Sequence, residues 1–185
     1  MEKAMLRILL LLVTVVVAAV IASCATTSPK VDKSQIPRFY LSPPTSKETL
    51  YGVGEAKMSS LDLSRTTALA RARDDVARQV RVSVKSALTD YAQEAGEEGN
   101  QQTLQFVESV SRQIVDVTLA GCRTDKVEVT DDGTAYALVS YGIQNVMDAA
   151  KTQFTRNEAS AFAEFKADEA VRRLNDEIQK NPPRP

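Results

Sequence analysis

A short apolar segment at the N-terminus constrains the rest of the chain more than any other feature. Between Ile8 and Ala22 there are fifteen residues without a charge, all apolar except Thr14, and Lys3 and Arg7 precede them. A helix that crosses the hydrocarbon core of a membrane needs about 20 apolar residues, so this segment is short for a spanning helix. A basic start, a short apolar centre and small residues at the end are typical of a secretory signal peptide, which is removed from the mature protein. The fold is therefore expected to form from the residues that follow.

The apolar segment ends in small residues followed by a cysteine. Ile21-Ala22-Ser23-Cys24 resembles the lipobox of bacterial lipoprotein precursors. In such precursors the signal peptidase recognises the three residues before the cysteine, here Ile21, Ala22 and Ser23, and the cysteine receives acyl chains such as palmitate. Each buried CH₂ contributes about 0.8 kcal/mol, so several chains hold a protein durably at a membrane. We expect residues 1–23 to be a cleaved signal peptide and Cys24 to be lipidated; the alternative is a buried cysteine at the end of an uncleaved anchor helix.

The composition argues against several classes of protein. Removal of residues 1–23 leaves 162 of the 185 residues, with 21 basic and 23 acidic side chains and a net charge of −2. Nucleic-acid binding is not expected, because it requires a basic surface. The whole chain has no His and two Cys, so it lacks imidazole bases and cannot form a Cys-rich tetrahedral metal site. We expect neither a metal nor a cofactor.

The residues after the lipobox indicate where the protein is expected to lie. Ala25, and not Asp, follows Cys24, which in enteric-type bacteria resembles the signal for sorting to the outer membrane. Residues 24–47 are rich in Ser, Thr, Pro and Lys, which predicts a flexible tether. An apolar patch at residues 36–41 interrupts it and either docks on the folded domain or contacts a partner. We expect a protein anchored in the outer membrane and facing the periplasm.

The folded domain is expected to begin near residue 48 with a short strand. Residues 49–56 alternate as in a strand, and Gly52 and Gly54 indicate that a helix lies close across one face. The small residues that would let a helix approach are Ala68, Ala70 and Ala72. A Gly-x-Gly pair can also begin a phosphate-binding loop, but the pattern lacks the third glycine and no Gly-Lys-Ser/Thr follows. Nucleotide binding is not expected.

A long helix is predicted near residues 60–95, because one apolar stripe recurs there at steps of three and four residues. Its members are Leu69, Ala72, Val76, Val80, Val84, Leu88 and Tyr91. Residues 80–84 also alternate and are β-branched, which favours a strand. The sequence therefore allows either a helix or a strand for residues 80–91, and the unbroken apolar stripe favours the helix.

Two further helices and a hairpin complete the predicted fold. A shorter helix is expected near residues 102–118, and alternating runs around an Asp-Gly turn predict a β-hairpin near residues 120–142. A helical pattern near residues 144–180 is longer than a small sheet needs, so its end either projects towards another subunit or protein or folds back. These patterns predict an α+β fold with a small antiparallel sheet, divided into a domain at residues 48–143 and a C-terminal helical extension at 144–185.

Arg71, Arg73 and Arg78 on the long helix form a candidate contact surface. Acidic neighbours such as Asp74 favour a solvated, paired helix face, whereas a contact surface would bind anionic lipid or cell-wall polymer. Adjacent acids occur in this helix and in the hairpin turn, but neighbours on a helix point apart, so no catalytic residues are expected. Cys122 is expected to pack as a small side chain, because no His is present to lower the pKa of its thiol.

The order of these motifs resembles that of the LPP20-type bacterial lipoproteins. The matching segments are the lipobox at Cys24, Tyr51-Gly52-Val53-Gly54-Glu55-Ala56, Ala68-Leu69-Ala70-Arg71-Ala72-Arg73 with Val76-Ala77, and Asp132-Gly133-Thr134-Ala135-Tyr136-Ala137-Leu138-Val139. The resemblance covers about residues 50–142 and implies a helix packed on a small antiparallel sheet, similar to dodecin-like folds and to domains of flagellum-associated envelope proteins. Members are envelope lipoproteins, some linked to flagellar assembly, and the family supplies no catalytic residues.

The sequence thus favours a non-catalytic, lipid-anchored envelope lipoprotein that acts as a structural or protein-docking module in flagellar or other envelope assembly. Its expected partners are the membrane, through acyl chains on Cys24, and envelope proteins or further copies of itself. The alternative is a module that binds cell wall or anionic lipid through Arg71, Arg73 and Arg78. A hydrolase is the least favoured hypothesis.

Overall fold

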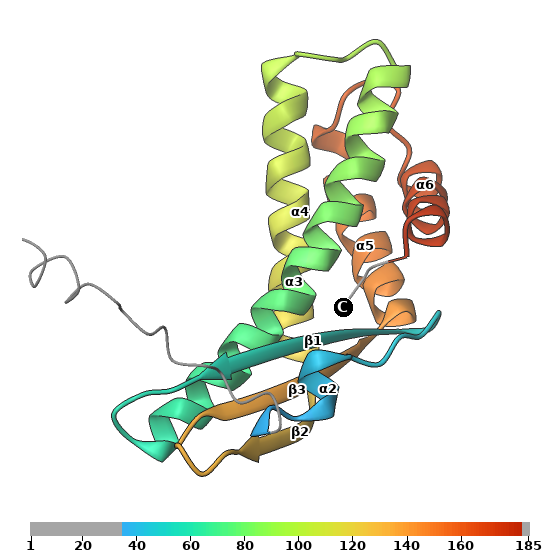
Figure 1. The fold of residues 1–185 in the computed structure, drawn as a ribbon. Coiled ribbons are helices and arrows are strands. Elements are labelled where there is room, and N and C mark those ends of the chain that lie inside the picture. Colours follow the sequence, from blue (N-terminus) through green and yellow to red (C-terminus); the bar gives the residue numbers. More distant parts are fainter. Residues whose placement is uncertain (1–34, 183–185) are drawn as a thin grey trace, which may run out of the picture. The chain divides into compact units, whose positions relative to one another are not determined.

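The computed structural model describes residues 35–182, so the signal-peptide segment, Cys24 and the first part of the predicted tether lie outside the described residues (Figure 1). The elements in chain order are α2 (Arg38–Leu41), β1 (Thr49–Ala56), α3 (Leu61–Glu94), α4 (Gln101–Gly121), β2 (Arg123–Val129), β3 (Ala135–Gly142), α5 (Ile143–Asn157), the 3₁₀ turn η2 (Glu158–Ser160) and α6 (Ala167–Lys180). The predicted α+β class, with a small antiparallel sheet in a mostly helical chain, is confirmed.

The three strands form an open sheet in the order β1-β3-β2, with both neighbours antiparallel to β3. The Asp-Gly turn joins β2 to β3 as predicted: Gly133 has φ 84°, and its N–H donates to Thr130 O at 2.9 Å. Seven consecutive residues of β3, from Ala135 to Tyr141, are buried. The central strand is therefore covered on both faces.

Helix α3 covers one face of the sheet at very close range. A Cβ atom built on Gly52 would lie 2.3 Å from Ala72 O, and one on Gly54 would lie 2.3 Å from Ala68 O. The expected contact between small residues of the strand and of the helix is confirmed, except that Ala70 is exposed. Figure 1 shows that the first half of α3 lies on the sheet and that its second half continues beyond the sheet beside α4.

Residues 80–91, for which the sequence allowed either a helix or a strand, are helical. Ser60 caps the start of α3, where its Oγ accepts a hydrogen bond from Leu63 N at 3.2 Å. The apolar stripe then stays in phase along the helix, and Val80, Val84, Leu88 and Tyr91 are all buried. Burial of one continuous face outweighs the strand preference of the β-branched residues.

Helix α4 is longer than predicted, and the hairpin begins later. The helix runs to Gly121, so the residues near position 120 that were expected to begin a strand are helical. Thr118 Oγ1 donates to Ile114 O at 2.9 Å within the helix, and Gly121 leaves room for the ring of Tyr141, whose Cε2 would lie 2.7 Å from an added Cβ. The first hairpin strand therefore starts at Arg123.

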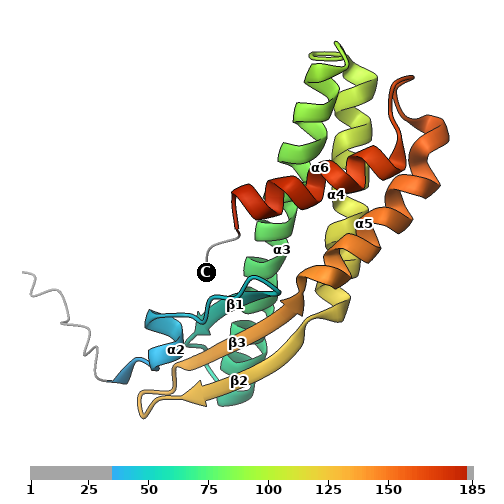
Figure 2. The same cartoon turned by 90° about the vertical axis from the view of Figure 1, so that its right-hand side faces the viewer.

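The single C-terminal helix expected near residues 144–180 is two helices, α5 and α6, and in this respect the prediction is wrong. Phe162 and Phe165 lie between them and pack with Tyr91 of α3, at ring-centroid distances of 5.5 Å and 5.7 Å. Phe165 is buried and Phe162 is half-buried in this contact, and the chain turns between the helices so that α6 folds back against α3 instead of projecting (Figure 2). Buried residues of α5 and α6 join the same core cluster as the sheet and α3.

The other face of the sheet is covered by α2. Phe39 is buried there against Tyr136 and Leu138 of β3, with Tyr51 and Val53 of β1 at the margin. The Tyr40 and Tyr136 rings meet edge to face at a centroid distance of 5.0 Å. The apolar patch within the predicted tether therefore docks on its own domain, and the sheet has the small helix α2 on one face and the long helix α3 on the other.

Candidate functional site

The residues expected to direct lipidation, Ile21, Ala22, Ser23 and Cys24, lie outside the described residues. Among the helices within residues 35–182, none is both long and apolar enough to cross a bilayer. The lipidation of Cys24 stays a prediction from sequence.

Arg71 of the candidate contact surface belongs to a set of side chains that closes the free edge of β1. Its Nη1 donates to Glu55 O at 2.6 Å. One turn along α3, Asp75 Oδ2 accepts from Val53 N at 3.2 Å, and a further turn along, Gln79 Nε2 donates to Tyr51 O at 2.9 Å. One outward backbone group of each of these three alternate β1 residues is thus bonded by a helix side chain, where a neighbouring strand would otherwise bond it.

Arg71, Asp75 and Gln79 together form what we call the edge cap. The spacing of these three residues follows from the geometry of α3 and β1. Four residues of helix rise about 6 Å, and two residues of strand rise about 6.6–6.8 Å. Side chains at steps of four on α3, namely Arg71, Asp75 and Gln79, therefore stay in register with alternate residues of a strand that runs alongside. The edge cap was missed in the sequence, although polar residues at these steps, beside the face that meets Gly52 and Gly54, are a signal that could have indicated it.

The three arginines of the candidate contact surface do not lie together. Arg78 is exposed on the same side of α3 as Arg71, and its Nη2 donates to Asp75 Oδ1 at 3.0 Å. Arg73 lies on a different side and is half-buried, and its Nε is a buried donor without a hydrogen-bond partner in the described part of the chain.

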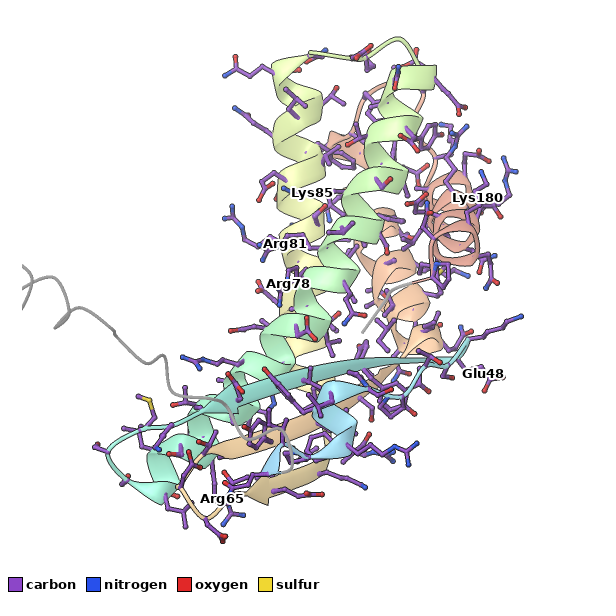
Figure 3. All side chains as sticks on the ribbon, viewed as in Figure 1. Glu48, Arg65, Arg78, Arg81, Lys85 and Lys180 are labelled. Carbon is purple, nitrogen blue, oxygen red and sulfur yellow. The ribbon has the colours of Figure 1, made fainter. Side chains whose placement is uncertain are left out.

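A row of basic side chains instead follows α3 beyond the sheet. Figure 3 shows Arg78, Arg81 and Lys85 one above another along α3 where it passes α4, and Arg65 far from them at the other end of the helix. Lys85 forms an ion pair with Glu108 of α4, and hydrogen bonding from Lys85 lowers the pKa of that carboxyl. Arg78 is paired with Asp75, so the row is partly neutralised at both of its ends.

The adjacent acids have architectural roles. Asp75 belongs to the edge cap, and Asp132 organises the hairpin turn by accepting from Thr130 Oγ1 at 2.6 Å, Thr134 N at 3.0 Å and Lys57 Nζ at 2.9 Å. These hydrogen bonds, that from Thr130 first, hold the pKa of the Asp132 carboxyl far below its usual range. Within residues 35–182, no three His, Cys, Asp or Glu side chains are grouped to hold a metal ion.

Cys122 is half-buried at the junction of α4 and β2. Its thiol donates to Thr118 O at 3.3 Å, and burial raises the pKa of the thiol, with Arg73 acting weakly in the opposite direction. A raised pKa reduces the thiolate fraction on which nucleophilic reactivity depends. The side chain therefore packs, as expected from the sequence.

The fold and the placement of these residues define a small α+β domain whose conspicuous polar side chains serve its own architecture. The LPP20 lipoprotein family model matches residues 37–141, more than half of the 185-residue chain, and the chain belongs to this family. The match runs from the start of α2 to the end of β3, so it includes the docking helix and excludes α5 and α6. Comparison with curated proteins and with solved structures found no match. Family membership supports a lipoprotein associated with the cell envelope.

Proposed function

We propose that the protein is a non-catalytic lipoprotein, anchored in the outer membrane by acyl chains on Cys24, whose periplasmic domain is a structural or protein-docking module. The observation that carries the proposal is the match to a lipoprotein family in a chain that also bears the lipobox-like Ile21-Ala22-Ser23-Cys24. Asp75, Asp132 and Arg71 are engaged in holding the fold, which supports an assembly role over catalysis.

The docking of α2 supports a domain held near the membrane. Each residue step of an extended chain spans at most about 3.6 Å, so the eleven steps from Cys24 to Gln35 reach about 40 Å when fully extended. Phe39 fixes the following residues to the sheet. An acylated Cys24 would therefore keep the α2 face of the sheet within that distance of the lipid headgroups.

The anchor is tested by replacing Cys24 with Ala in the full-length protein expressed in a diderm bacterium. Metabolic labelling with a palmitate analogue should disappear, and the protein should leave the membrane fraction. Cys122→Ser is the matched control and should label and fractionate as the unchanged protein does, because its thiol packs inside the domain. Normal labelling of Cys24→Ala would contradict the lipoprotein proposal, and recovery of the unchanged protein with the inner membrane would contradict its outer-membrane location.

The assembly role has a separate test. Deletion of the coding sequence is expected to impair motility or envelope integrity, and restoration should require the lipidated protein. Intact motility with an envelope defect would place the protein in a non-flagellar assembly. If neither phenotype changes and crosslinking in intact cells captures no protein, the docking role is wrong.

A second candidate function is binding of anionic lipid or cell-wall polymer through the basic row on α3. The observation that favours it is the alignment of Arg78, Arg81 and Lys85 in Figure 3. Replacing Arg78 and Arg81 by Gln should reduce co-sedimentation of the full-length protein with anionic vesicles or isolated cell wall. Added salt should also reduce co-sedimentation, because it screens the attraction between the charges. Arg65→Gln, which removes a cation from the other end of the helix, is the control, and an equal effect of both changes would eliminate this surface.

A further inference from the structure

The two edges of the sheet are treated differently by the fold. The β1 edge is closed by the cap from Arg71, Asp75 and Gln79. The β2 edge carries no such cap: within residues 35–182, no side chain bonds the outward backbone groups of Val127 or Val129. One edge is therefore available for pairing with another strand.

The hydrogen bonds of the hairpin show which groups β2 presents. Thr130 N donates to Thr134 O at 3.0 Å, which makes this the first bonded pair of the hairpin. Bonded and non-bonded pairs alternate in an antiparallel ladder, so Glu128 and Lys126 bond β3, in register with Tyr136 and Leu138. The N–H and C=O groups of Val127 and Val129 consequently point outward.

We propose that β2 pairs antiparallel with β2 of a second copy of this chain, centred on Val127, to form a continuous six-stranded sheet. In this register Val127 lies opposite its own counterpart, and Lys126 of each copy lies opposite Glu128 of the other. Both charged side chains are exposed on the α2 face of the sheet. Opposite charges at directly opposed positions favour pairing.

The charges select this register. Moving the centre by one residue places two copies of Lys126 directly opposite each other in one direction, and two copies of Glu128 in the other. Like charges at opposed positions are destabilising. Charges on an edge strand ordinarily discourage pairing with unrelated strands. Here the charges of β2 are complementary to those of β2 in a second copy. They therefore favour self-pairing while they disfavour pairing with unrelated strands.

The length of the paired segment is limited by an irregularity in β2. Thr124 and Lys126 lie opposite consecutive residues of β3, so Asp125 is the extra residue of a bulge. The regular part of the outer edge is therefore short, from residue 126 to residue 129. Val129 at its end is 42% exposed and would lie opposite Asp125 of the other copy.

Symmetry makes this pairing compatible with one membrane. An antiparallel pair of identical edge strands is related by a two-fold axis perpendicular to the sheet, which leaves the faces of both sheets on the same sides. Both α2 helices then lie on one face, and both α3 helices lie on the other. This compatibility rests on the proposed acylation of Cys24, whereas the pairing itself does not.

The test exchanges the opposed charges in the full-length protein in detergent micelles, with association measured by sedimentation. The unchanged protein should form dimers. Lys126→Glu and Glu128→Lys should each raise the dissociation constant about tenfold or more, because every opposed pair becomes repulsive. The double variant Lys126→Glu/Glu128→Lys restores opposite charges with the same composition and should recover dimerisation.

A crosslink tests the centre of the register. Val127→Cys, in a Cys122→Ser background, should form a disulfide-linked dimer on mild oxidation, because bonded antiparallel pairs place Cα atoms about 5.5 Å apart. Val82→Cys in the same background is the control, since Val82 is 63% exposed on α3. A monomeric protein, equal crosslinking at both positions, or dimers unaffected by the charge changes would overturn the pairing. Dimers that persist without palmitate labelling would support the pairing and contradict only the anchor.

Discussion

Gly52 and Gly54 lie where α3 comes so close to β1 that a Cβ atom on either would meet a main-chain oxygen at 2.3 Å. A main-chain oxygen cannot rotate away as a side chain can, so the helix itself would have to shift. We expect Gly54→Ala to lower the free energy of unfolding by about 1–3 kcal/mol, the usual cost of overpacking, or by more. Urea unfolding followed by circular dichroism measures the loss.

Gly142→Ala is the matched control for the Gly54 variant. The nearest atom to an added Cβ at Gly142 is Asn145 Nδ2 at 3.4 Å, the end of a movable side chain. Gly142→Ala should lower the free energy of unfolding by clearly less than Gly54→Ala does. If the two variants lose equal stability, close approach is not what selects glycine in β1.

The carboxyl of Asp132 gives the hairpin turn a pH dependence. Hydrogen bonds from Thr130, Lys57 and Thr134 lower its pKa in the folded protein from the ordinary value of 3.8. A carboxyl with a depressed pKa contributes stability that is present above its unfolded-state pKa and lost as the pH falls through its folded-state pKa. We expect the urea midpoint of Asp132→Asn to depend less on pH in the acid range than that of the unchanged protein.

The neighbouring Asp131 provides the comparison for this titration. Asp131→Asn removes an exposed carboxyl from the same turn and should leave the acid dependence of the urea midpoint in place. An NMR titration that found Asp132 at its ordinary pKa would contradict the role assigned to it.

At the scale of elements, the edge cap decides which side of the sheet can accept a strand. Asp75→Ala would leave the partly buried Val53 N–H without an acceptor, a loss that typically costs about 1–3 kcal/mol. We expect faster amide hydrogen exchange at Val53 and a stronger tendency of the protein to self-associate as the β1 edge opens. Asp74→Ala, one residue earlier and exposed, is the control and should change neither measurement.

The elements that could be predicted from the sequence are those with local signals. Helix α3 followed from its apolar stripe, the hairpin turn from Asp132-Gly133, and the close helix-on-sheet contact from Gly52 and Gly54. These features depend on residues near one another in the chain, so spacing alone indicates them.

The features that were missed depend on contacts between distant segments. The break between α5 and α6 lies where the rings of Phe162 and Phe165 pack against Tyr91, far earlier in the chain, and a helical period cannot show this contact. The roles of Arg71 and Asp75 likewise depend on backbone groups of β1. Polar helix residues seen alone suggest a solvated face, so the sequence indicated a contact surface where the structure has an edge cap.

At the scale of the whole molecule, α6 and the segment before it are tied to α3 by Tyr91 and by one ion pair. Tyr91 Oη donates to Glu164 O at 2.9 Å and accepts from Lys166 N at 3.1 Å, which fixes the segment that turns the chain into α6. Arg173 lies 4.4 Å from the centre of the Tyr91 ring and also bonds Glu94 at 2.7 Å and Glu169 at 2.8 Å. Tyr91 therefore supplies the polar contacts that fix the turn before α6, while Ala170, Leu174 and Ile178 bury the helix in the core.

Replacing Tyr91 by Phe separates the contribution of the hydroxyl hydrogen bonds from that of ring packing. The ring remains against Phe162 and Phe165, while the hydroxyl is lost. Two partly buried backbone groups lose their partner, so we expect a loss of about 1–3 kcal/mol. Because the lost bonds fix only the turn before α6, amide exchange should accelerate in α6 and remain slow in β3. Tyr51→Phe, at the margin of the α2 face, is the control and should leave exchange in α6 unchanged. Equal acceleration in β3 would mean that α6 and the sheet unfold as one cooperative unit, and the C-terminal helices would then be an integral part of the family domain instead of an addition to it.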